Sequence, residues 1–131
     1  MNTRGATPTT NRAVQVLRWF FGIYFVAVGI MHFVLPAGLP QQMAWMYDLS
    51  SGQHLLAGIA EILGGLGLIL PRLTGTAPRL TALAAGGLAL VMVSAAIWHI
   101  SRGEGTMIVG NLLMATAMTY VAFKEWRATK A

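Results

Sequence analysis

The chain has 131 residues, of which 56% are hydrophobic and only 10% are charged, far from the composition of a soluble globular protein. A soluble fold of this size has too little polar surface to cover so much apolar material, so a lipid bilayer is the expected surrounding. The net charge of +5 is spread over the termini and the connections instead of one patch, which excludes nucleic acid as a partner.

Four long apolar segments follow one another, each near the length that crosses a bilayer. They cover residues 17–35, 54–70, 80–100 and 107–123. Residues 1–12, ahead of the first segment, are expected to form a flexible tail. The sequence therefore predicts an all-α fold, an integral membrane four-helix bundle that makes one domain of residues 1–131.

Proline and serine residues mark the expected ends of the segments. Pro36 and Pro40 end the first segment, and Pro71 stops the second, because proline cannot donate a helical hydrogen bond. Ser50 or Ser51 is placed to cap the start of the second segment.

The connection over residues 36–53 has a pattern of its own. Leu39, Met43, Met46 and Tyr47 recur at helical spacing, which predicts a short interfacial helix. The equally weighted alternative is an ordinary loop, in which Trp45 and Tyr47 belong to the aromatic belt at the membrane surface.

Basic residues are distributed very unevenly between the two sides of the predicted bundle. The connections over residues 36–53 and 101–106 lie on one side of the membrane, and Arg102 is their one basic residue. The other eight of the nine Lys and Arg residues lie on the opposite side, with both termini. Because cytoplasmic connections are rich in Lys and Arg, both termini are predicted to lie in the cytoplasm, in a bacterial inner membrane.

One carboxylate, Glu61, lies inside the apolar run AGIAEILGG. A charge at this depth is costly unless it is paired, hydrated or protonated, so Glu61 is expected to avoid lipid. Its helical neighbours include Gly58, Gly64 and Gly65, and small residues let helices approach closely. Glu61 is therefore predicted to face the inside of the bundle.

Each of the other helices carries a comparable polar group. His32, His99 and Asn111 each share a helical face with small or apolar residues that suit the interior. With the predicted orientation, all three lie with Glu61 in the outer third of the membrane. His54, at the start of the second segment, is interpreted as an interfacial side chain.

The predicted polar cluster has three interpretations. It is a packing network that fixes helix assembly, or a first-row metal site made by His32, Glu61 and His99, or a ligand site. No close spacing of ligands supports the metal. Met92 and Met114 provide an adaptable apolar wall for a ligand, or plain packing between helices.

Proton exchange with a quinone needs a titratable pair beside an apolar slot. In this hypothesis the catalytic pair is Glu61 with His32, and the ligand-binding residues are His99, Asn111, Met92 and Met114. The chain has no cysteine, so electrons are expected to come from a protein partner.

The segments GIMHFVLPAGLP, LLAGIAEILGGLGLILPRLT and IWHISRGE, in this order, resemble the DoxX family of small membrane proteins over about residues 14–125. The resemblance implies a four-helix membrane bundle, and it carries the family glutamate onto Glu61 and the family glycines onto Gly64 and Gly65. Members are named after a subunit of a thiosulfate and quinone oxidoreductase, which implies a redox-associated membrane subunit. Many have lysine where this chain has His32.

A hypothesis of a different class is a non-enzymatic membrane protein. It is a binder or transporter of small molecules, or a structural subunit whose polar cluster only fixes assembly. The pairs Ala60 with Gly64 and Ala82 with Gly86 suit packing within one bundle or within a homo-oligomer, and the sequence leaves both open.

Overall fold

The computed structural model describes residues 11–130, and within this range the chain is helical with short connections. The helices are α1 (Arg12–Met31), η1 (Gln41–Asp48), α2 (Ser51–Thr74), α3 (Arg79–Arg102) and α4 (Gly105–Ala128). The predicted all-α class is confirmed. The predicted tail covers residues 1–12; residues 1–10 lie outside the described range, whereas Arg12 already begins α1.

All four long helices are apolar and long enough to cross a membrane. Three of them have 24 residues, about 36 Å of helix, against a hydrocarbon core about 30 Å thick. Leu56, Leu90 and Val34 are 70% or more exposed, which suits lipid and not water. The chain is an integral membrane protein.

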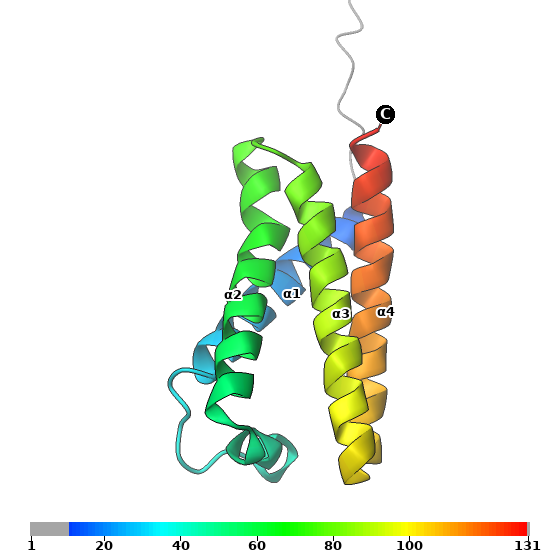
Figure 1. Ribbon diagram of the computed structural model, residues 1–131. Helices are drawn as coiled ribbons and strands as arrows, with labels where there is room; N and C mark the ends of the chain where they lie inside the picture. The colour runs from blue at the N-terminus through cyan, green and yellow to red at the C-terminus, as the bar shows by residue number, and fades with distance from the viewer. Residues whose placement is uncertain (1–10, 131) are drawn as a thin grey trace, which may run out of the picture.

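The arrangement of the helices is visible in Figure 1. The helices α2, α3 and α4 run side by side, and α1 crosses behind α2 and α3. Helix α1 begins, and α4 ends, at the same end of the bundle, while η1 lies at the opposite end, beside the start of α2. A buried apolar core joins the four long helices; it includes Phe25, Leu68, Leu88, Met92 and Met118.

The prediction that Pro36 and Pro40 end the first helix is wrong, because α1 already ends at Met31.

The boundaries of α2 agree with local chemistry, with one correction. Ser50 and Gln53 form a reciprocal capping box at the start of α2, as expected for a serine there. The prediction that Pro71 stops this helix is wrong, because α2 continues to Thr74. Proline costs one hydrogen bond to the preceding turn, and the helix ends where Gly75 adopts the left-handed conformation at φ 68°.

The segment between α1 and α2 contains the short helix that the residue spacing predicts. Helix η1 is of the 3-10 type, and it buries Met46 completely. The Tyr47 hydroxyl donates to the carbonyl oxygen of Pro36 at 2.6 Å and accepts from the Leu39 amide at 3.0 Å. These bonds hold the connection against η1.

Glycines let α1 and α2 pack with their backbones in contact. A β carbon built on Gly65 would lie only 2.7 Å from the carbonyl oxygen of Gly22. One built on Gly29 would lie 2.8 Å from the side chain of Ile62. Small residues are thus required along this interface, and the approach they allow brings the end of α1 against the middle of α2.

Candidate functional site

A half-open cavity of about 580 Å³ lies inside the bundle, toward the end that η1 covers. The structure places all six residues that the sequence proposes for a site on its wall: His32, Glu61, Met92, His99, Asn111 and Met114. The remainder of the wall is mostly apolar. Its side chains include Phe25, Val28, Leu49, Leu56, Leu90 and Val91, with Tyr24, Trp45, Gln53 and Trp98 as polar or amphipathic members.

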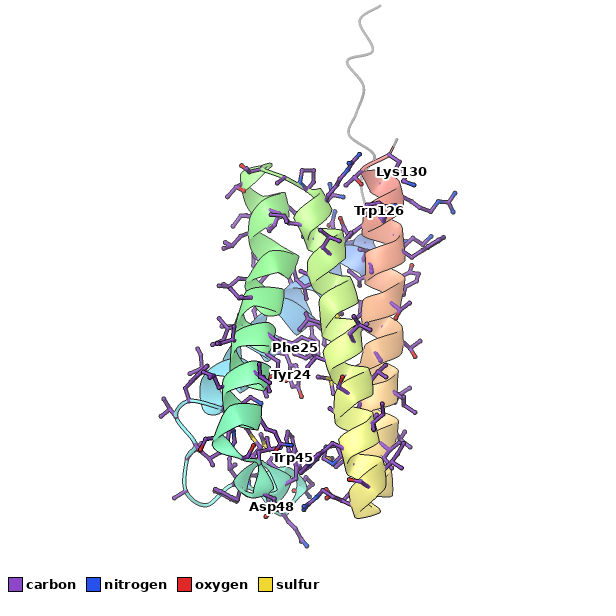
Figure 2. The ribbon with its side chains drawn as sticks, in the orientation of Figure 1. Tyr24, Phe25, Trp45, Asp48, Trp126 and Lys130 are labelled. Atoms are coloured by element: carbon purple, nitrogen blue, oxygen red, sulfur yellow. The ribbon has the colours of Figure 1, made fainter. Side chains whose placement is uncertain are left out.

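The cavity opens sideways, between α2 and α3. Leu56 of α2 and Leu90 of α3 both belong to its wall and are 73% and 70% exposed, so they form a rim that faces lipid. Figure 2 shows Tyr24 and Phe25 of α1 in the space between α2 and α3.

The pair of Glu61 and His32 forms one side of the cavity. Glu61 lies on the face of α2 that packs on α1, and His32 is the C-cap residue of α1. The two residues are 5% and 6% exposed, and Nε2 of His32 lies 3.4 Å from Oε2 of Glu61. This ion-pair distance is outside hydrogen-bond geometry, and the Glu61 carboxylate accepts no hydrogen bond from any residue within 11–130.

His54, predicted to be an interfacial side chain, lies in the first turn of α2 and extends this pair. Its Nδ1 lies 2.9 Å from Nδ1 of His32, so one ring donates and the other accepts. Helix α2 begins at Ser51, before the expected start of the segment, and His54 lies within its first turn on the same face as Glu61. The sequence shows this shared face, but it does not show that α1 ends at Met31 with His32 beside it.

The opposite side of the cavity carries His99, which is 1% exposed. Its Nδ1 donates to Oε2 of Glu104 at 3.2 Å, and its ring packs edge-on against Trp45 of η1 and Trp98 of α3. Because Glu104 holds one nitrogen and two indoles hold the ring, His99 has a fixed orientation on the wall.

Asn111 lies near the start of α4 and is 9% exposed. Its side-chain amide makes no hydrogen bond to the described part of the chain. Because the side chain also lines the cavity, its amide is free to bond a molecule there.

A metal ion bound by His32, Glu61 and His99 does not agree with this arrangement. Within residues 11–130 no three His, Cys, Asp or Glu side chains lie close enough together to hold one ion. His32 is engaged by Glu61 and His54, whereas His99 is engaged by Glu104. The three predicted ligands line one cavity but do not converge.

Ion pairs hold η1 against the end of the cavity that it covers. Arg102, at the end of α3, donates to Oδ2 of Asp48 at 2.5 Å and also to Glu104. The hydrogen bonds from Arg102 and from His99 hold the pKa of the Glu104 carboxyl below its ordinary value of 4.5. In Figure 2, Trp45 and Asp48 lie together on η1 at this end of the bundle.

A second buried polar cluster, at the other end of the bundle, is absent from the sequence prediction. Glu125 of α4 is fully buried; its Oε2 lies 2.5 Å from both Nε and Nη2 of Arg72, and its Oε1 lies 3.3 Å from Nε of Arg18. Arg18 also donates to the carbonyl oxygen of Leu68 at 3.0 Å. These contacts tie α1, α2 and α4 together.

The sequence contains a signal for this cluster. Glu125 is the one acidic residue on the side of the membrane to which eight basic residues are assigned. An arginine buried at that end of the bundle therefore has Glu125 as its available counter-ion. The prediction missed it because it ends the last segment at residue 123, whereas α4 continues to Ala128.

The fold defines an integral membrane protein with four long helices that enclose a mostly apolar cavity. The model of the DoxX-like family matches residues 16–122, and the chain belongs to this family. No curated protein and no solved structure matches the chain significantly.

Proposed function

We propose that this DoxX-like protein is a redox-associated subunit that binds a quinone, or a similar small apolar molecule with a polar head, in the cavity. A volume of about 580 Å³ lies within the range of about 300–1,000 Å³ that small-molecule sites occupy. The wall is mostly apolar with a few polar groups, and the opening faces lipid, where quinones dissolve.

The observation that carries the proposal is the environment of Glu61. Its carboxylate is buried beside an apolar cavity, lies at ion-pair distance from His32 and accepts no hydrogen bond from the described chain. Burial of such a group costs free energy that packing alone does not recover. A hydroxyl of a bound ligand would supply the missing hydrogen bond.

The residues on the wall suit exchange of protons with a quinone. Reduction of a quinone to a hydroquinone consumes two electrons and two protons. In the proposal Glu61 and His32 exchange one proton with one ligand oxygen. The free amide of Asn111 donates a hydrogen bond to the other oxygen, which exchanges the second proton with water. The electrons come from a partner protein, because the chain has no cysteine to hold them.

The proposed location is a bacterial inner membrane with both termini in the cytoplasm. The asymmetry of basic residues supports this orientation, because all nine Lys and Arg residues except Arg102 belong to the side where both termini are expected. The cavity then lies in the outer half of the membrane.

Native mass spectrometry of protein released gently from membranes tests the proposal. We expect the wild type to retain a quinone, or to take up added ubiquinone-1, and the Glu61→Gln variant to be folded but empty. Asp48→Asn is the matched control, because it removes a carboxylate at the same end of the bundle but outside the cavity wall. Equal occupancy of the wild type and Glu61→Gln would contradict the proposal.

A structural role for the same residues is the second candidate. The contact between His32 and Glu61 joins the end of α1 to α2, and a polar contact between membrane helices can serve assembly alone. The two functions predict different outcomes when both side chains are replaced together. A binder loses its ligand, whereas a structural subunit tolerates the double replacement.

A further inference from the structure

The geometry points to a proton relay from Glu61 through His32 to His54, which connects the cavity with the water at the outer end of the bundle. This inference deepens the proposed function and rests on it, because the relay would serve the protons that Glu61 exchanges with the ligand. It assigns a role to His54, a residue outside the cavity wall.

Three side chains form a continuous row. Oε2 of Glu61 lies 3.4 Å from Nε2 of His32, and Nδ1 of His32 lies 2.9 Å from Nδ1 of His54. Both nitrogens of the His32 ring are therefore engaged, one on each side. Exposure increases along the row: Glu61 and His32 are buried, and His54 is half-buried in the first turn of α2, beside exposed residues.

The hydrogen-bond chemistry of the row permits transfer in both directions. In the neutral arrangement Nε2–H of His32 faces the Glu61 carboxylate, and Nδ1 of His32 accepts from Nδ1–H of His54. A proton that binds Nε2 of His54 from water releases the Nδ1 proton to His32, and His32 passes its Nε2 proton to Glu61. One proton enters from water, one reaches the carboxylate, and no group is oxidised or reduced.

Transfer to Glu61 requires a small approach of the two side chains. The distance of 3.4 Å must shorten to about 2.7–3.2 Å, a change of a few tenths of an ångström that lies within ordinary side-chain motion. The other titratable groups on the cavity wall are Tyr24 of α1 and His99 of α3, and His99 is already bonded to Glu104. The His32 and His54 rings therefore form the connected path.

Time-resolved infrared spectroscopy after a pH jump tests the relay. The carboxylic acid band that is absent in Glu61→Gln reports protonation of Glu61, and no quinone is added. In His54→Ala we expect this band to form about 100-fold more slowly than in the wild type. His54→Gln, which keeps a polar side chain but does not carry a proton, is expected to be equally slow.

Two further measurements separate a relay from a structural effect. Imidazole in the buffer should restore the rate in His54→Ala, because it fills the space left by the ring and carries a proton. Asp48→Asn, which removes a titratable group at the same end of the bundle but outside the cavity wall, should leave the rate unchanged. A wild-type rate in His54→Ala, or a slow rate that imidazole does not change, would overturn the relay. Both measurements are made without a ligand. Ligand binding is tested separately, by comparing the quinone occupancy of the wild type with that of Glu61→Gln.

Discussion

Nε2 of His32 and Oε2 of Glu61 lie 3.4 Å apart at the point where α1 ends against α2, and both side chains also line the cavity. One contact thus belongs to the helix interface and to the binding site. The contribution of this contact to stability and its contribution to ligand binding can be distinguished when both properties are measured on the same variants.

Replacement of His32 and Glu61, singly and together, makes this separation. Each single change to leucine should destabilise the protein, by about 3–5 kcal/mol if the remaining charge stays buried and unpaired. The double change should recover much of the stability. If the site binds a quinone, the double variant should still be empty. Thermal unfolding in detergent and quinone occupancy provide the two measurements, and a stable double variant with full occupancy or full function would favour the structural role.

The buried cluster at the other end of the bundle should contribute to stability alone. Glu125→Gln leaves Arg18 and Arg72 without their counter-ion, so we expect a loss of about 3–5 kcal/mol in the free energy of unfolding. Quinone affinity should change little in the folded fraction, because the cluster does not touch the cavity. Arg79→Gln, which removes a basic residue that does not contact Glu125, is the control. Unchanged stability in Glu125→Gln would show that the cluster is not formed.

Most of the fold, and six of the residues that line the cavity, could be predicted from the sequence. Long apolar runs define membrane helices, and the cost of a charge in lipid places Glu61 inside the bundle. Which polar side chains contact one another could not be predicted from hydropathy. His54 joins His32 because α1 ends early, and Glu125 is buried because α4 is long; both depend on helix ends, which hydropathy defines poorly.

The close contact of α1 and α2 at their glycines predicts that one added methyl group at Gly65 destabilises the protein. Gly65→Ala places a β carbon 2.7 Å from the carbonyl oxygen of Gly22, which is backbone and cannot rotate away. We expect a loss of about 1–3 kcal/mol in stability from overpacking. Gly86→Ala on α3 is the control, because a β carbon there has no atom within 4 Å. Equal stability of the two variants would contradict this close packing.

The ion pairs of Arg102 with Asp48 and Glu104 attach η1 to the end of α3, and they are partly exposed to water, which weakens them. In Arg102→Gln, hydrogen exchange of the η1 amides should accelerate by about two- to fivefold, because exposed ion pairs contribute little.

The lowered pKa of Glu104 predicts that the attachment of η1 depends on pH. The contribution of its carboxylate is complete above the ordinary value of 4.5 and is lost as the pH falls through the lowered value of the folded state. The protection factors of the η1 amides, which correct for the intrinsic pH dependence of exchange, should therefore fall in acid in the wild type, and fall less in Glu104→Gln.

Fluorescence titration with ubiquinone-1 tests the central claim, that the cavity binds a quinone through Glu61, most directly. Trp45 and Trp98 line the cavity, so a bound quinone should quench their emission. We predict saturable quenching in the wild type and an affinity at least tenfold lower in Glu61→Gln, since a hydrogen bond to a charged group contributes about 1.5–3 kcal/mol. Ala95→Phe, which fills the cavity, should abolish the saturable signal. Quenching that does not saturate, or the same affinity in all three proteins, would contradict a quinone site in this cavity.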